Sequence, residues 1–488
     1  MTGADGTPLI VAALLLPLAG AAIAFAMPRT TRWVGIATAV VLLAVVVMLC
    51  GAVGAGGELS HAVGGWGAPL GIALRVDGLS AAMLLTTAAV SLAVAAYGRS
   101  YFRDESAGPA GFTPLSMLLI AGLNALFVSG DLFNVYVTLE VLGLSAAALV
   151  ARAGTPEALT GAMRYLLVTV AASLVYLLGV ALLYHLTGTL DIRLVGARLE
   201  SGAAAWSAVG LIGAAMLLKS AVFPLHFWLP PAHANAPAPV SALLSALVVK
   251  ASLYVLLRVW LDVLPAARAD FGAVVGALGC AAVLWGSTQA LRQDQLKLLV
   301  AYSTVAQVGY LFIPFAFTSA AAAGTAWRGA VYLVLCHALA KTAMFMSVGN
   351  IQLFGGDRIG ELDRVVQRLP LTMAAFAVAG ITVAGLPPSG GFVAKWLILE
   401  AAVQEGRWFV SAVVLVGGLL ASIYVFRVIG PAFTKGAQPR QPRRVPNAME
   451  WVAFAVALAT VLLGFFGMPL LELIDAGAPF GNALEPER

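Results

Sequence analysis

About fourteen apolar runs, each near the length of a membrane-spanning helix, follow one another along the 488-residue chain. A bilayer core of ~30 Å needs about 20 such residues per helix. The charged residues, 28 basic and 23 acidic, are too few to cover a soluble 50.2 kDa globule. The sequence therefore predicts an all-α polytopic membrane protein. The runs lie near residues 9–27, 33–54, 77–97, 113–130, 132–151, 160–186, 205–229, 240–263, 272–291, 297–318, 327–349, 370–404, 409–431 and 448–467.

Basic residues in the short loops predict the orientation of the helices. One set of alternate loops holds roughly twice as many as the other, and an excess of Lys and Arg is typical of cytoplasmic loops. We therefore expect both termini to lie outside a bacterial inner membrane. The only charged residue before the first run is Asp5, so the run lacks the basic start of a signal peptide and we expect it to be retained. The basic excess suits lipid headgroups better than nucleic acid. The richer set consists of Arg29, Arg32, Arg99, Arg103, Arg152, Arg292, Arg358, Arg364, Arg368, Lys435, Arg440, Arg443 and Arg444.

Proline-rich segments interrupt two of the runs, at residues 219–231 and 385–395. Proline breaks a helix, and broken helices at matching places in two halves are the best sequence indication of a transport site. The broken runs are the seventh and the twelfth. This spacing predicts two five-helix repeats, helices 4–8 and 9–13, which are inverted because five is odd. The corresponding divisions are residues 1–110, 111–264, 270–431 and 445–488.

Six ionisable residues are predicted to lie at membrane depth. A central charge costs ~3 kcal/mol on the insertion scale, so the Glu and Lys residues among them cost of order 15 kcal/mol together. We expect such a set to be retained for proton movement. Its members are Glu140, Lys219, Lys250, His337, Lys341 and Lys395, with His226, His233, Tyr302 and Ser303 as secondary candidates.

Lysine and arginine are distributed differently along the chain. The loops use almost only Arg, which cannot lose its proton, whereas most of the six lysines fall inside apolar runs. A buried lysine can be brought near neutrality, and a nearby glutamate would hold it charged. A Glu140–Lys219 pair that opens and closes would therefore act as a proton switch.

Each candidate also has a purely structural interpretation. Lys219 could snorkel from a helix end, and Lys250 or Glu140 could belong to a static ion pair. His337 could be a hydrogen-bonded core residue, and His226 and His233 could order the loop around the break. Tyr302, Ser303 and Gln307 could join helices by hydrogen bonds. Lys297 follows Asp294 at a helix start, so we expect it to be a surface anchor.

Bond-forming chemistry has little support in the sequence. The Lys219-Ser220 pair lacks the upstream glycines of a phosphate-binding loop, and Cys50, Cys280 and Cys336 form neither a zinc nor a disulfide pattern. No loop is long enough for a nucleotide-binding or redox domain. We expect a conduit without a cofactor or a metal, and not an enzyme in the ordinary sense.

Several motifs together resemble a known family over about residues 75–430. They resemble those of the proton-translocating antiporter-like subunits of respiratory complex I, membrane-bound hydrogenases and multisubunit Mrp-type Na+/H+ antiporters. The motifs are residues 130–140 (GDLFNVYVTLE), 219–230 (KSAVFPLHFWLP), 236–244 (APAPVSALL), 294–310 (DQLKLLVAYSTVAQVGY), 337–341 (HALAK) and 385–395 (GLPPSGGFVAK).

The resemblance implies fourteen helices, a Glu140–Lys219 switch, and a hydrated axis through Lys250 and the His337/Lys341 pair to an exit-side lysine, Lys395. Two further positions bear on how closely the chain follows the family. Pro231 stands where the family often has an acidic residue, which puts a proton-loading role of that loop in doubt, and Arg164 lies near a position that is often basic.

The resemblance favours a D-type subunit of a multisubunit Na+/H+ antiporter, with other membrane subunits, protons, Na+ and lipid as partners. The alternative is an N-type proton-pumping subunit of a complex I-like or hydrogenase assembly, which would make the chain part of a translocase. A scaffold that has lost transport is the third possibility, but no lysine is missing from the axis.

Overall fold

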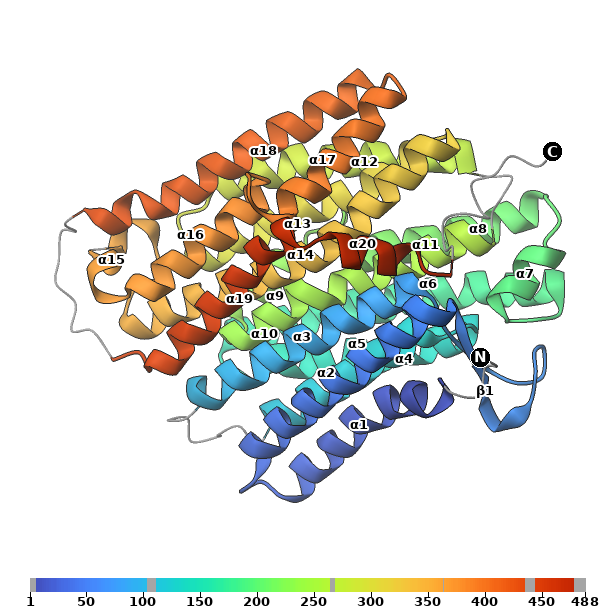
Figure 1. Cartoon of the computed structure of the whole chain (residues 1–488), viewed down its shortest axis with the longest axis horizontal. Helices are drawn as coiled ribbons and strands as arrows, with labels where there is room; N and C mark the ends of the chain where they lie inside the picture. The colour runs from blue at the N-terminus through green and yellow to red at the C-terminus, as the bar shows by residue number, and fades with distance from the viewer. Residues whose placement is uncertain (1–5, 103–110, 264–267, 363, 435–443, 478–488) are drawn as a thin grey trace.

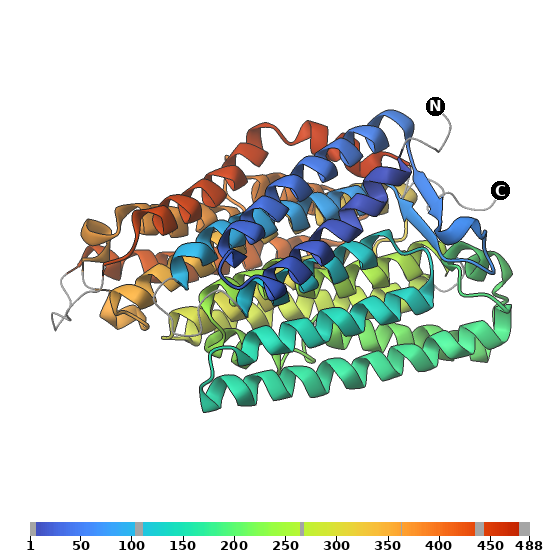
Figure 2. The same ribbon diagram turned by 90° about the horizontal axis from the view of Figure 1, so that it is seen from below.

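A computed structural model describes residues 6–102, 111–263, 268–362, 364–434 and 444–477. The chain is mainly helical, and its long helices lie side by side along the length of the molecule (Figures 1 and 2). Arg103, Lys435, Arg440, Arg443 and both chain ends, on which part of the predicted orientation depends, lie outside the described residues.

Eleven helical segments in the described part of the chain are long and apolar enough to cross a membrane, and three further apolar helices are shorter. The predicted multi-pass helical fold is confirmed, while the count of fourteen and the inverted repeats stay predictions. The helices are α1 (Thr7–Ala26), α2 (Thr31–Gly56), α3 (Gly78–Tyr101), α4 (Phe112–Val128), α5 (Leu132–Ala151), α6 (Pro156–Thr187), α7 (Ile192–Arg198), α8 (Ala203–Lys219), α9 (Leu229–Asn235), α10 (Ala238–Leu243), α11 (Val249–Asp262), α12 (Arg268–Arg292), α13 (Leu296–Phe312), α14 (Ala320–Phe354), α15 (Val365–Arg368), α16 (Pro370–Ala384), α17 (Gly390–Gln404), α18 (Trp408–Ile429), α19 (Asn447–Phe465) and α20 (Met468–Asp475).

A β-hairpin between α2 and α3 was not predicted. Its strands, β1 (Leu59–Ala62) and β2 (Ala73–Val76), pair antiparallel, with Leu59 opposite Val76 and Ala62 opposite Ala73. Backbone bridges join Leu74 to Ser129 and Asp131 to Asp191 beside it. The hairpin therefore closes one end of the bundle together with α7, the end that we expect to face outside and call the outer end (Figure 1).

Aspartate side chains begin the helices at this outer end. Asp77 accepts a hydrogen bond from the Ser80 N–H at 2.9 Å, and Asp131 accepts one from the Asn134 N–H at 2.8 Å. Asp191 accepts from two N–H groups of α7. These caps satisfy backbone donors that have no partner within the helix, and a negative charge is favourable at a helix N-terminus.

Both predicted helix breaks are confirmed. α8 ends at Lys219, and regular helix resumes only at Leu229, after Pro224. α16 ends at Ala384 with Gly385 in the left-handed region (φ 79°), and α17 begins at Gly390. Glycine adopts that conformation without the steric cost of a Cβ, so the chain can turn out of the helix there.

The longest helix, α14, lies in the interior of the bundle. It packs against α3, α10, α13, α16, α17 and α19. Of its most apolar 18-residue stretch, 94% is buried. His337 and Lys341 lie on this helix, four residues apart and therefore on one face. A helix with very little surface left for lipid thus carries two of the six candidate residues.

Candidate functional site

Glu140 and Lys219 lie on α5 and α8, which both pack against α6. Lys219 is the last residue of α8 and is 5% exposed, whereas Glu140 is partly buried. The charge of Glu140 acts on Lys219 through space, but no ion pair joins these two described side chains. The predicted partners are therefore neighbours in an open arrangement.

Lys250 lies in the first turn of α11 and is almost completely buried. The preceding turn, η2 (Leu244–Val248), is a π-helix. The Lys250 Nζ donates a hydrogen bond to the carbonyl oxygen of Ser245, and the Ser245 hydroxyl bonds that of Thr304 on α13 at 2.8 Å. Lys250 is thus bound to a backbone carbonyl, and Ser245, which supplies it, connects the lysine to α13.

Lys341 is fully buried and contacts α13 directly. Its Nζ donates to the Val300 carbonyl oxygen at 3.0 Å and to the hydroxyl of Ser303, one of the secondary candidates. His337, one turn earlier, has no hydrogen-bond partner for either ring nitrogen within the described part of the chain. Its ring lies within electrostatic range of Lys250, Lys341 and Lys395, so it belongs to the same cluster as these lysines.

Lys395 lies on α17 and reaches back across the second break. Its Nζ donates to the Val383 carbonyl oxygen at 2.7 Å and lies 3.5 Å from that of Ala384, at the end of α16. The ammonium group also lies 4.2 Å from the centre of the Tyr310 ring. A cation is favourable at the C-terminus of a helix and over an aromatic face, so both contacts stabilise the charged form.

The two histidines of the first break differ in their surroundings. His226 is partly exposed, and its ring centre lies 6.3 Å from that of Tyr302. His233 on α9 is fully buried and stacks on Phe345 with ring centres 5.2 Å apart. Neither ring nitrogen of His233 has a hydrogen-bond partner among the described residues. His233 also lies within electrostatic range of Lys250, Lys297 and Lys341, which makes it the more central of the two.

Lys297 was predicted to be a surface anchor, and this prediction is wrong. Its side chain is buried, and its Nζ donates to the Ala236 carbonyl oxygen at 2.7 Å. That carbonyl belongs to the segment after the first break, 61 residues away. The preference of this chain for Arg in its loops was the sequence signal that could have placed Lys297 inside.

The lysines on α8, α11, α13, α14 and α17 share one property. They are all buried, and none of these five described side chains forms an ion pair. Four of them donate to carbonyl or hydroxyl oxygens instead. An amine whose partners are neutral oxygens can exist with or without its proton, whereas an amine locked to a carboxylate stays charged. Within the described residues, no group of His, Cys, Asp and Glu could hold a metal ion.

Comparison with known proteins identifies the family of the chain. The family model described as NADH:quinone oxidoreductase/Mrp antiporter, TM, matches residues 129–421. The chain belongs to this family. The N subunit of the NADH-quinone oxidoreductase of Desulforudis audaxviator is 36% identical, over 95% of this chain and 97% of that protein. The D-type chain of the Na(+)/H(+) antiporter of Bacillus subtilis is 29% identical, over 98% of each. A chain in the structure of the Mrp complex from Dietzia sp. superposes with a TM-score of 0.91 at 26% identity, covering 99% of this chain and 98% of that one.

All ten candidate residues lie inside the matched range. The structure brings Ser303 to Lys341 and Tyr302 towards His226. Two further polar side chains were not selected as site residues: Gln307, which we considered only as a residue that joins helices, and Tyr424. They lie close together beside Ser303, on α13 and α18, although Gln307 makes no hydrogen bond within the described chain.

Proposed function

We propose that this chain moves protons across a bacterial membrane as one subunit of a multisubunit monovalent cation/H+ antiporter, with Na+ as the cation. Protons pass along Lys219, Lys250, His337, Lys341 and Lys395. The observation that carries the proposal is the set of buried lysines that form no ion pair with any described residue, since such amines can change protonation state. The subunit works without a cofactor, and its partners are other membrane subunits and lipid. Both chain ends face outside.

Glu140 controls the first lysine of this path. When its carboxylate approaches Lys219, the pair holds a proton on the amine. When the two separate, burial favours the neutral amine and the proton moves on towards Lys250. The partly buried position of Glu140 beside a buried Lys219 suits such a movement.

Variants of this pair test the proposal in everted membrane vesicles that contain the chain with its partner subunits. Lys219→Ala and Glu140→Ala are expected to lose cation/H+ exchange, followed as cation-induced collapse of a pH gradient. Lys219→Arg is expected to fail as well, because Arg keeps the charge but cannot release its proton.

Glu400→Gln provides the matched control, because Glu400 is an exposed carboxylate on α17. Its exchange rate is expected to equal that of the native chain. Native exchange by Lys219→Ala would exclude the proposed path. If Lys219→Arg alone exchanged at the native rate, Lys219 would act only through its positive charge and would not transfer a proton.

A second assembly is favoured by a separate observation. The 36% identical relative that spans nearly the whole chain is named as a subunit of an NADH-quinone oxidoreductase. In that setting the same lysine path would be driven by electron transfer in other subunits. Affinity purification of the native complex distinguishes the two assemblies. Small membrane subunits alone support the antiporter, and subunits that carry flavin or iron–sulfur clusters support the redox-driven pump.

A further inference from the structure

Three side chains of α11 form a polar row that leads from the centre of the bundle to its outer end. Lys250, Tyr254 and Arg258 are spaced four residues apart and so share one face of the helix. At 1.5 Å per residue, Arg258 lies ~12 Å closer to the helix end than Lys250. The row points from a buried lysine of the proposed path towards the surface.

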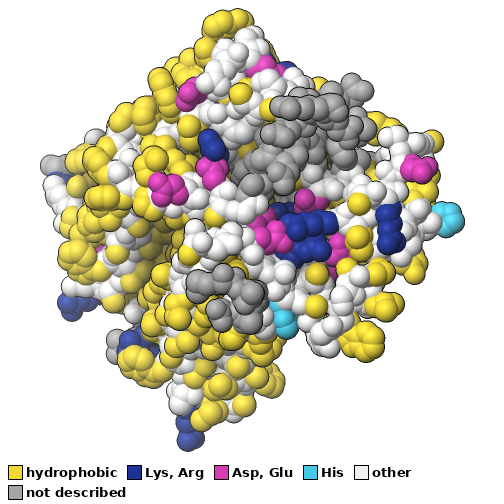
Figure 3. All heavy atoms as spheres, turned by 45° about the vertical axis from the view of Figure 1, so that its right-hand side comes forward, with side chains coloured by type: hydrophobic (Ala, Val, Ile, Leu, Met, Phe, Trp, Pro, Cys, Tyr) yellow, Lys and Arg dark blue, Asp and Glu magenta, His cyan; other side chains and the backbone are white. Residues whose placement is uncertain are grey.

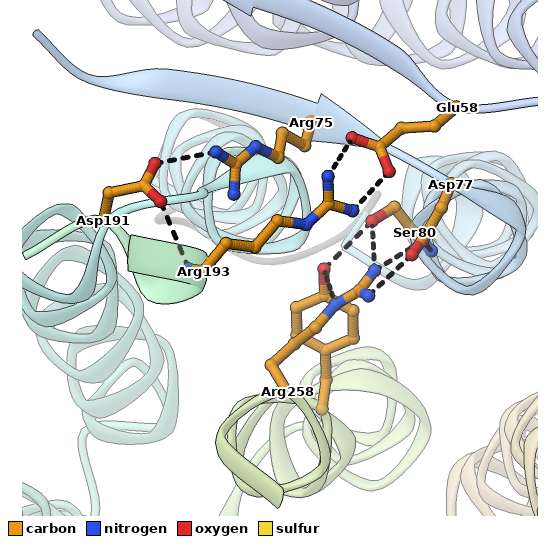
Figure 4. A network of polar contacts seen from close by, with 8 residues as sticks. Glu58, Arg75, Asp77, Ser80, Asp191, Arg193 and Arg258 are labelled. Atoms are coloured by element: carbon orange, nitrogen blue, oxygen red, sulfur yellow. Dashed lines mark hydrogen bonds and ion pairs between the residues drawn. The ribbon is translucent and has the colours of Figure 1, made fainter. Parts of the chain in front are cut away.

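Arg258 is held by several partners at once (Figure 4). Its two terminal nitrogens donate to the two oxygens of the Asp77 carboxylate, one of them at 2.6 Å, and a terminal nitrogen also donates to the Ser80 hydroxyl at 2.9 Å. Its Nε donates to the Tyr254 hydroxyl at 3.0 Å. The side chains of Arg258 and Asp77 are only 13% and 6% exposed. A bidentate pair of this kind fixes the guanidinium group in one orientation.

The described polar groups around Arg258 do not form a chain of hydrogen bonds that could carry a proton past this side chain. The Tyr254 hydroxyl donates its proton to the Phe127 carbonyl oxygen at 2.6 Å, and a carbonyl cannot pass a proton on. Both Asp77 oxygens already accept hydrogen bonds from Arg258, and one also accepts from the Ser80 N–H. Burial alone would raise the pKa of Asp77, but Arg258 and the Ser80 donors hold it below its ordinary value. Arg258 itself never releases a proton.

The backbone around this cluster is also closely packed. At Gly196 on α7, a Cβ would collide with the carbonyl oxygen of Asp262, and at Gly78 it would collide with that of Leu473 on α20. Beyond the cluster, Arg75 pairs with Asp191 at 2.8 Å, and Arg193 pairs with Glu58, the residue directly before the hairpin. On the surface turned forward in Figure 3, Lys and Arg side chains lie against Asp and Glu side chains. Helix ends and ion pairs therefore close this end of α11.

We propose that Arg258, clamped by Asp77, is a seal that prevents protons on Lys250 from leaking out along α11. Protons must then continue to Lys341 and Lys395, and movement through the chain stays coupled to the rest of the complex. The role assigned to Lys250 here depends on the proposed function. The seal itself is a property of passive permeability, so it is measured without active exchange.

Passive decay of an imposed pH gradient tests the seal in vesicles that contain the full chain with its partner subunits, without a transported cation or respiration. Arg258→Met removes the cation at similar length. The double variant Arg258→Met/Asp77→Asn also removes the buried carboxylate that would otherwise be left unpaired and could prevent folding. Arg258→Met is expected to dissipate the gradient about tenfold faster than the native chain, since one unit charge within a few ångström changes a barrier by this order. The double variant keeps the net charge of the site but loses the bidentate clamp, so it is also expected to dissipate the gradient faster than the native chain.

Arg328→Met is the matched control. Arg328 pairs with Asp475 at 2.8 Å, but its side chain is 51% exposed, so its loss should leave the decay unchanged. Adding Lys250→Met to the double variant is expected to restore slow decay, because the lysine that supplies the leak is gone. Native decay in the folded double variant would overturn the seal, and a leak that persists without Lys250 would overturn its connection to Lys250. Failure of the proposed function would appear instead as native exchange by Lys219→Ala.

Discussion

Lys341→Met is expected to abolish proton movement through the chain while leaving the protein at least as stable as the native form. Lys341 is fully buried on α14, and its amine binds the Val300 carbonyl and the Ser303 hydroxyl. Removal of a positioned proton-transfer group costs about 100-fold or more in rate. Methionine fills a similar volume without a polar group, and burial of a charge is itself costly.

Two measurements are needed, because only their combination is diagnostic. Exchange is followed in everted vesicles, and thermal unfolding is followed on the purified complex in detergent. A structural lysine would show the reverse pattern, with a lower melting temperature and residual exchange. Lys341→Arg separates charge from proton release and is expected to be inactive, since Arg keeps its proton. Exchange at the native rate by Lys341→Met would remove Lys341 from the path.

Gly309→Leu is expected to prevent stable folding of the second half of the bundle. A Cβ at Gly309 on α13 would lie 2.7 Å from the backbone nitrogen of Val283 on α12 and 3.0 Å from the Ala282 Cβ. Conversely, a Cβ at Gly279 would lie 2.7 Å from the Gly309 carbonyl oxygen. Small residues let membrane helices approach this closely. Because the obstacle is backbone and cannot rotate away, we expect a cost of about 3 kcal/mol or more.

Gly210→Leu controls for the loss of a glycine from a helix. Gly210 on α8 is exposed, and a Cβ there would meet nothing within 4 Å. The yield of monodisperse protein and its melting temperature should fall sharply for Gly309→Leu and stay near native for Gly210→Leu. Equal behaviour of the two variants would show that the α12–α13 contact does not limit stability.

The helices and their two breaks were predictable from local sequence. An apolar run of bilayer length has few alternatives to a helix, and Pro224 and Gly385 interrupt regular structure through their own backbone chemistry. The hairpin was not recognised, because its strands have four residues each and the intervening segment is rich in glycine. Such short strands carry too few alternating positions to be read from their pattern.

The candidate site was predictable only as a set of residues and not as a set of contacts. Buried lysines are conspicuous in an apolar chain, so Lys250, Lys341 and Lys395 could be selected directly. Their partners could not, because backbone carbonyls such as those of Val300 and Val383 have no sequence signature. Lys297 was misread for the same reason, since its acceptor, the Ala236 carbonyl, comes from a distant segment. The seal at Arg258 was missed because Asp77 is 181 residues away.

The π-helical turn η2 sets the orientation of both Lys250 and Arg258, because both follow it on the same helix. A π-turn holds one residue more than an α-turn, and one residue corresponds to ~100° of rotation and 1.5 Å of rise. That single extra residue therefore sets the direction in which each later side chain of the helix points. Lys250, Tyr254 and Arg258 rotate together, so the direction in which the lysine points and the alignment of Arg258 with Asp77 are fixed by the same turn.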